Sequence, residues 1–174
     1  MSTTALEDLA RRLSCVEAQQ QVRNTLGRYM QLCDQPCADR GFPQLADLFT
    51  QDAVWEGVGA LYAGTFGRHQ GRQAIAAFVG AYLAPSTHFR RNLHFLTSDQ
   101  LCISEDGASA RGHWLMLQLS TYGDGDSPAQ AITARLNVDF APLPDGRWLI
   151  AHFRTERLEA VPWQQQEHGA ERRA

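Results

Sequence analysis

Residues 91–122 read RNLHFLTSDQLCISEDGASARGHWLMLQLSTY, and this stretch decides the fold. Apolar and polar residues alternate along two segments, 91–104 and 108–122, and the dipeptide Asp106-Gly107 lies between them. Such alternation is typical of β-strands, and Asp-Gly is a favoured turn between antiparallel strands. The stretch therefore predicts two long antiparallel strands joined by a tight turn.

Two further segments, 129–141 and 147–158, extend the predicted sheet because they alternate in the same way and are bounded by turns rich in Gly, Pro and Asp. Within residues 113–119 almost every position is apolar. We therefore expect both faces of this strand to be covered, one by helices and the other by a second subunit. A homodimer or homotrimer is the expected assembly.

The first part of the chain predicts helices. One apolar stripe with spacings of three, four or six residues predicts a helix over residues 8–34, and it consists of Leu13, Val16, Val22, Leu26, Tyr29, Met30 and Cys33. Shorter helices are expected over residues 43–49 and 75–82, with a strand at 52–56 between them. Five glycines between Gly57 and Gly71 predict a loop.

Helices followed by a curved antiparallel sheet indicate an α+β fold in which the long helix lies on one face of the sheet. At 174 residues the chain has the length of one domain, which we place at residues 8–160 and follow with a polar tail over 161–174.

Composition excludes several classes of function. The chain carries 16 basic and 19 acidic side chains, so no positive field attracts nucleic acid or an anionic membrane. All basic residues are Arg, which excludes a Schiff-base lysine mechanism. The four cysteines form no CxxC pair and no histidine pair has metal-ligand spacing, so neither a disulfide framework nor a metal site is expected. Without an apolar leader sequence, we expect a cytoplasmic protein.

Asp34 is the first candidate for chemistry. It falls four residues after Met30 and eight after Leu26, so it extends the apolar stripe and would face the interior. The alternative is that the helix has already ended and that Asp34 caps the following turn. A carboxylate that is buried needs a partner.

His94 is the leading candidate for that partner because it lies on a predicted strand between apolar neighbours. A carboxylate bonded to one imidazole nitrogen fixes the tautomer and leaves the other nitrogen as a general base. A single histidine on such a strand is more often a core residue than a catalyst. His88, in the loop after the third predicted helix, and His113, on the next strand, are competing candidates, although a solvated loop residue and a sheet residue are the simpler interpretations of them.

Arg157 shares one strand face with Phe153 and Thr155 and is therefore an inward cation. It would either bind an anionic or carbonyl group of a ligand or form an ion pair with Asp34 or Asp139. Tyr29, Trp55 and Trp114 are core aromatic residues unless a cavity makes them its wall.

The chain resembles the SnoaL-like members of the nuclear transport factor 2-like superfamily, which includes the scytalone and bile-acid dehydratases. The resemblance extends from about residue 18 to residue 158. The matching residues are Arg28-Tyr29, Asp34, the segment Leu48 to Gly57, Gly71 to Ile75, His94 to Leu96, Gly112 to Trp114 and Asp145 to Trp148.

This resemblance implies a cone-shaped α+β barrel with a catalytic Asp–His pair at Asp34 and His94. It also implies that Tyr29 and Arg157 line the pocket. Two positions depart from the bile-acid enzyme: Gln118 replaces an acidic residue, and Gly57 replaces a second pocket tyrosine. With Trp55 as pocket wall, these positions give Tyr29, Trp55, Gln118 and Arg157 as candidate substrate-binding residues.

Two classes of function follow. The first is a lyase or isomerase without cofactor, resembling the dehydratases, that acts on a hydrophobic polycyclic or aromatic small molecule by His–Asp general base catalysis. The second is a non-catalytic ligand-binding or assembly domain, resembling the small subunits of ring-hydroxylating dioxygenases. A short Asp34–His94 distance beside an apolar cavity would favour the enzyme.

Overall fold

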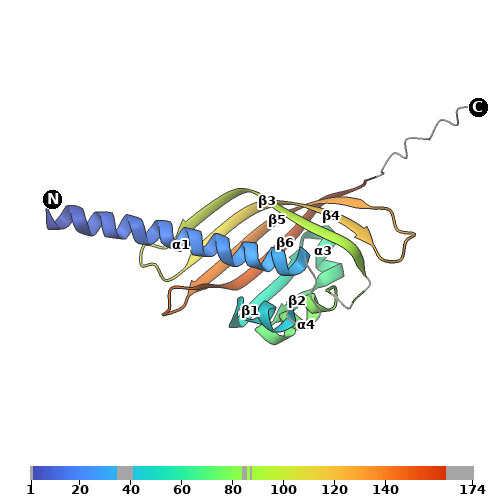
Figure 1. Ribbon diagram of the computed structural model, residues 1–174, viewed down its shortest axis with the longest axis horizontal. Coiled ribbons are helices and arrows are strands. Elements are labelled where there is room, and N and C mark those ends of the chain that lie inside the picture. The colour runs from blue at the N-terminus through green and yellow to red at the C-terminus, as the bar shows by residue number, and fades with distance from the viewer. Residues whose placement is uncertain (1, 35–40, 84–85, 87, 164–174) are drawn as a thin grey trace, which may run out of the picture.

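The computed structural model describes residues 2–34, 41–83, 86 and 88–163, and shows an arched sheet of six strands with helices alongside it (Figure 1). The predicted α+β fold with a curved sheet is confirmed. The helices are α1 (Thr3–Asp34), α2 (Gly41–Ala46), α3 (Gly59–Phe66) and α4 (Arg72–Gly80). The strands are β1 (Phe49–Val58), β2 (Arg68–Gln70), β3 (Phe89–Ile103), β4 (Ala110–Tyr122), β5 (Gln130–Pro142) and β6 (Trp148–Pro162).

The sheet has the strand order β2-β1-β6-β5-β4-β3. The four long strands predicted from the alternation form an antiparallel meander, and β1 joins it by pairing in parallel with β6. The register places His94 opposite Gln118 and Trp55 opposite Phe153. Because side chains alternate across a strand, these pairs direct residues from distant parts of the chain to the same face of the sheet.

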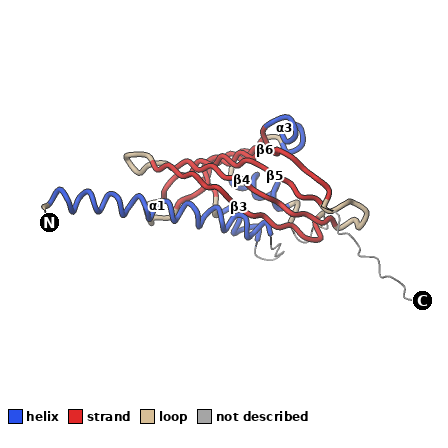
Figure 2. Tube along the Cα trace, turned by 90° about the horizontal axis from the view of Figure 1, so that it is seen from above, coloured by secondary structure: helices blue, strands red, loops and turns tan. Residues whose placement is uncertain are grey.

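Helix α1 packs on the concave side of the arch through its second half (Figure 2). Its buried side chains are Val22, Leu26, Tyr29, Met30 and Leu32. A hydrogen bond of 2.6 Å from the Thr25 hydroxyl to the Trp148 carbonyl fixes the helix to the start of β6. Its contact with the sheet carries Asp34, the last residue of α1, to β3.

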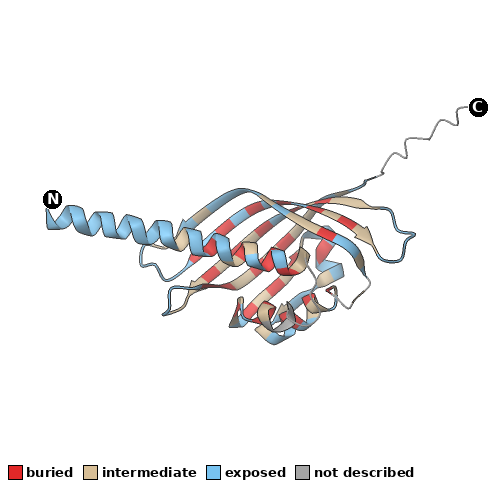
Figure 3. Cartoon of the chain, viewed as in Figure 1, coloured by how far each residue is buried: buried red, intermediate tan, exposed pale blue. Residues whose placement is uncertain are grey.

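The first half of α1 extends beyond the sheet (Figure 3). Leu13 and Val16 are 56% and 62% exposed, so the prediction that they belong to the buried stripe is wrong. Leu6 and Leu9 are exposed to a similar extent. The periodicity predicts the helix correctly but not how much of it contacts the sheet, since a helix of 32 residues is about 48 Å long.

The prediction of a loop over residues 57–71 is also wrong, because α3 and β2 lie there. Gly57 allows α3 to pack directly over β1: a Cβ atom at this position would lie 2.9 Å from the Tyr62 carbonyl oxygen. Gly57 is therefore needed for the close packing of α3 on β1 and not for a turn.

Other element boundaries also differ from the prediction, and helix α1 begins at Thr3, five residues before the predicted start. Helix α2 ends at Ala46, and Phe49 begins β1 instead of ending that helix. Helix α4 ends at Gly80, so Tyr82 follows it. Strand β6 continues to Pro162 and takes in the first residues of the predicted tail, whose residues 164–174 lie outside the described part of the chain.

The hydrophobic core lies between α1, α4 and the concave face of the sheet (Figure 3). Trp114 is a core residue as predicted, with its ring edge against Phe140. The convex face carries Phe95, Leu115 and Leu117, which are 47%, 45% and 36% exposed in the single chain. No helix within the described residues is both long enough and apolar enough to span a bilayer.

Candidate functional site

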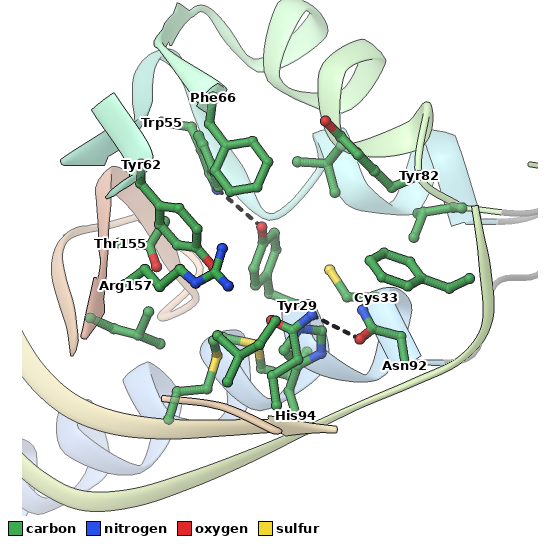
Figure 4. Close-up of a pocket in the computed structure, with 18 of the residues that line it drawn as sticks. Tyr29, Cys33, Trp55, Tyr62, Phe66, Tyr82, Asn92, His94, Thr155 and Arg157 are labelled. Atoms are coloured by element: carbon green, nitrogen blue, oxygen red, sulfur yellow. Dashed lines mark hydrogen bonds between the residues drawn. The ribbon is translucent and has the colours of Figure 1, made fainter. Parts of the chain in front are cut away.

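A cavity of about 360 Å³ lies between the concave face of the sheet, the end of α1, and helices α3 and α4 (Figure 4). Most of its wall is apolar or aromatic. The aromatic residues in the wall are Tyr29, Trp55, Tyr62, Phe66, Phe78, Tyr82, Phe89, Tyr122 and Phe153. The polar side chains are Cys33, Thr65, His88, Asn92, His94, Gln118, Gln130, Thr155 and Arg157. Few polar groups in an apolar wall are typical of a small-molecule site.

Asp34 and His94 meet at one side of this cavity. One carboxylate oxygen, Oδ1 of Asp34, lies 2.6 Å from His94 Nδ1 and also accepts the His94 backbone N–H at 2.9 Å. The side chains of His94 and Asp34 are 11% and 20% exposed. Sequence spacing left open whether Asp34 faces inward or caps a turn, and the structure directs its carboxylate to His94.

This contact determines which imidazole nitrogen is free. A carboxylate acceptor at Nδ1 holds the proton of a neutral ring on that nitrogen. Nε2 then carries the lone pair, and it has no hydrogen-bond partner within the described residues. Since His94 lines the cavity, the pair presents a base to whatever occupies it.

Tyr29 and Cys33, one helical turn apart on α1, both line the cavity as neutral groups. The Trp55 indole N–H donates to the Tyr29 hydroxyl at 3.1 Å. Burial raises the pKa of Tyr29 well above its usual range and raises the pKa of the Cys33 thiol to about 12. Cys33 is therefore a thiol and not a thiolate nucleophile at neutral pH, whereas Tyr29 keeps a proton to donate.

Arg157 brings a cation into the cavity wall. Its guanidinium lies 5.9 Å from the centre of the Tyr62 ring, and its Nε is buried with no hydrogen-bond partner among the described residues. The predicted ion pair with Asp34 or Asp139 is wrong, because Asp34 bonds to His94, and Asp139 bonds to Arg111 at 2.7 Å and to Arg154 at 2.9 Å. The guanidinium also lowers the pKa of Tyr62, although burial outweighs it and raises that pKa overall.

Gln118, predicted to contact substrate, belongs to a buried polar cluster in the wall. Its Nε2 donates to Asn92 Oδ1 at 2.9 Å and to Ser120 Oγ at 3.0 Å. The Ser120 hydroxyl in turn donates to Asn92 Oδ1 at 2.8 Å. Gln118 is the cross-strand neighbour of His94, so this cluster lies directly beside the Asp34–His94 pair.

The competing histidines have other surroundings. His113 is exposed outside the cavity and hydrogen-bonds to Asn137, so it cannot replace His94. His88 lines the cavity but is exposed, with its ring edge against Tyr82 and Tyr122. Within the described ranges, no group of three or more His, Cys, Asp and Glu side chains is placed to hold a metal ion.

Sequence reasoning missed Cys33, Tyr62 and Asn92 as cavity residues. A signal existed for Asn92, which precedes His94 by two residues and therefore shares its strand face. Cys33 belongs to the predicted apolar stripe, and the sequence does not indicate a cavity beside it. Tyr62 was hidden by the loop predicted from the glycines around it.

Several solved structures share the fold of this chain over most of its length. A putative scytalone dehydratase from Novosphingobium aromaticivorans is 16% identical, with a TM-score of 0.68 over 88% of this chain and 92% of that one. The hexachlorocyclohexane dehydrochlorinase LinA-type3 from Novosphingobium barchaimii is 17% identical, with a TM-score of 0.69 over 87% and 94%. An NTF2-like protein with a cystatin-like fold, also from N. aromaticivorans, is 21% identical, with a TM-score of 0.67 over 91% and 93%.

At these identities the similarity shows a shared fold, and the comparison with curated proteins gives no match. The family model for the SnoaL-like domain matches residues 14–154, which include Asp34, His94, strands β3 to β5 and the first part of β6. The chain therefore belongs to the SnoaL-like family.

Proposed function

We propose that this protein is a lyase or isomerase that removes a carbon-bound proton from a hydrophobic polycyclic or aromatic small molecule, without a cofactor. The observation that carries the proposal is the 2.6 Å contact between Asp34 and His94 Nδ1, which leaves Nε2 free at an apolar cavity. A general base needs a fixed orientation and an accessible lone pair, and this pair supplies both.

In the proposed mechanism, His94 Nε2 takes a proton from a carbon next to a carbonyl group. The electron pair of the C–H bond moves into the carbonyl, whose oxygen becomes an oxyanion. Asp34 stabilises the imidazolium, while the Tyr29 hydroxyl or the Arg157 guanidinium holds the oxyanion. In an elimination, the electron pair then expels a hydroxyl group from the next carbon, and the imidazolium returns its proton so that water leaves.

The unpaired Arg157 supports an electrophilic role. Arg157 is half-buried, and its buried Nε has no partner among the described residues, so a ligand that supplies negative charge would offset the cost of burying this N–H group. The names of two structural neighbours, a putative dehydratase and a dehydrochlorinase, agree with an elimination.

The test uses 3-hydroxy-1-tetralone, a bicyclic β-hydroxy ketone that loses water to give 1-naphthol. We expect the protein to accelerate formation of 1-naphthol, followed by its fluorescence. His94→Gln should slow the reaction by about 10²- to 10⁴-fold, which is the usual contribution of a positioned base. Exchange of the carbon-bound protons of 2-tetralone in D2O measures proton removal without elimination. The same variant, His94→Gln, should slow this exchange by the same factor.

His113→Gln is the matched control, because His113 lies outside the cavity, and it should leave both rates unchanged. Equal rates for the wild type and His94→Gln would contradict the proposal. Binding of both tetralones without exchange or elimination would favour the alternative, a non-catalytic ligand-binding domain.

A further inference from the structure

We propose that Asn92 and Gln118 form a hydroxyl-binding subsite in the cavity wall and that Ser120 is a positioning residue behind it. The inference deepens the proposed function and rests on it in one respect, namely that the substrate occupies the cavity beside His94. It narrows the substrate class to polycyclic or aromatic compounds that carry a hydroxyl group.

The hydrogen bonds of the cluster determine which atoms remain free. Asn92 Oδ1 accepts from both Gln118 Nε2 and Ser120 Oγ, and Gln118 Nε2 uses its two protons within the cluster. Asn92 Nδ2 and Gln118 Oε1 are therefore left over, and neither has a partner among the residues that the structure describes. Both side chains line the cavity, so the leftover atoms form one donor and one acceptor for a ligand.

This result does not depend on how the two amides are assigned. If both amide groups were turned over, Asn92 would donate to Gln118 and to Ser120, and the Ser120 hydroxyl would donate to Gln118. The free atoms would then be Asn92 Oδ1 and Gln118 Nε2, which again are one acceptor and one donor. Turning only Asn92 would set a donor against a donor, and turning only Gln118 would set an acceptor against an acceptor, so the two groups are locked together.

Ser120 acts only through the other two residues. It is 1% exposed and does not line the cavity, yet its hydroxyl bonds to both amides. It thereby holds the amides in one of the two arrangements that keep a donor and an acceptor toward the cavity. A hydroxyl group of a ligand matches this pair because it can donate one hydrogen bond and accept another.

The subsite lies beside the proposed base. Asn92 precedes His94 by two residues on β3, and Gln118 lies opposite His94 on the neighbouring strand β4. Figure 4 shows Asn92 beside Cys33 and His94, with Arg157 on the opposite side of the cavity. A ligand with a hydroxyl group at the amides would therefore place its adjoining ring carbons near His94 and direct its other end toward Arg157.

The experiment compares the binding of 1-naphthol and 1-methylnaphthalene, which have similar shape and differ in a hydroxyl and a methyl group, by isothermal titration calorimetry. We expect the wild type to bind 1-naphthol about tenfold more tightly, because the methyl group leaves the donor and the acceptor unpaired. Asn92→Leu and Gln118→Met should each reduce this preference to about threefold or less. Ser120→Ala should reduce it partly, although Ser120 contacts no ligand.

The matched controls are Asn137→Leu on the convex face and Gln100→Met on β3, which lie outside the cavity wall and should keep the tenfold preference. Melting curves verify that each variant folds, and Asn92→Ala replaces Asn92→Leu if the latter does not. An unchanged preference in both amide variants would overturn the proposal, as would a preference that disappears only in His94→Gln. Failure of the proposed function gives a different result. In that case the protein would not form 1-naphthol from 3-hydroxy-1-tetralone, yet it would still bind 1-naphthol more tightly than 1-methylnaphthalene.

Discussion

A single oxygen of Asp34 accepts two hydrogen bonds from His94, one from the ring Nδ1 at 2.6 Å and one from the backbone N–H at 2.9 Å. The backbone contact fixes the position of the His94 main chain relative to Asp34, and the ring contact fixes the orientation of the imidazole. We expect the neutral ring to carry its proton on Nδ1. Nitrogen NMR of labelled protein should show a protonated Nδ1 and an unprotonated Nε2, and the reverse pattern would contradict the assigned base.

Variants of Asp34 should separate structure from chemistry. Asp34→Asn keeps an oxygen that accepts from both groups of His94, so the melting temperature should change little while turnover falls. Asp34→Ala leaves the backbone N–H of His94 unpaired and should lower the free energy of unfolding by about 1–3 kcal/mol. Thermal unfolding of both variants checks this prediction, and equal losses of stability would mean that the negative charge itself stabilises the fold.

Arg157→Met should stabilise the protein, because it removes a buried Nε that has no hydrogen-bond partner among the described residues and replaces a half-buried cation with apolar atoms. We expect a gain of about 1 kcal/mol in the free energy of unfolding, together with at least a tenfold loss of affinity for 1-naphthoate.

Arg154→Met is the matched control on the same strand. Arg154 bonds to Asp139 at 2.9 Å, so its removal should destabilise the protein by about 1–2 kcal/mol. Urea titration measures both variants. A stability loss in Arg157→Met would show that the guanidinium is held by contacts of its own.

Cys33 should make stability sensitive to alkaline pH. Burial raises its pKa from 9.0 to about 12. The unfolded thiol therefore ionises first, so the stabilising contribution is complete below about pH 9 and is lost as the pH rises toward 12. At pH 10 the loss in the free energy of unfolding should be about 1–2 kcal/mol. Cys33→Ala should flatten this part of the profile, whereas Cys15→Ala, at an exposed position of the same helix, should not.

Two leucines of α1 provide a test of where the helix is held. Leu26 is fully buried and Leu13 is 56% exposed. Leu26→Ala should cost about 2–5 kcal/mol of stability, and Leu13→Ala less than about 0.5 kcal/mol. Chemical denaturation at several protein concentrations is the measurement. A large, concentration-dependent effect of Leu13→Ala would instead show that a second copy of the chain covers this part of the helix.

Much of this molecule can be predicted from its sequence because its signals are local. The four strands of the meander follow from alternation, and the spacing of Asp34 to Leu26 and Met30 indicates an inward position as one of two alternatives. The lack of an ion pair for Arg157 among the described residues could not be predicted, because it depends on Asp34 bonding to His94 and on Asp139 bonding to Arg111 and Arg154 on the convex face.

The aromatic wall could not be predicted for a related reason. Tyr62 reaches the cavity only because Gly57 lets α3 approach β1, and the glycines in that segment resemble those of a loop. The amide cluster needs the register between β3 and β4, which places Gln118 opposite His94. Strand alternation gives the face on which a residue lies but not its partner on the next strand.

The strand that carries His94 and Asn92 is also the last strand on its side of the sheet. Sheet edges with unpaired amides invite strands of other molecules and promote aggregation. At His94 this amide is already occupied by the Asp34 carboxylate. Asp34, which aligns His94, thus also covers part of the exposed edge of the sheet. A chain without this carboxylate would leave the His94 amide open to a strand of another molecule.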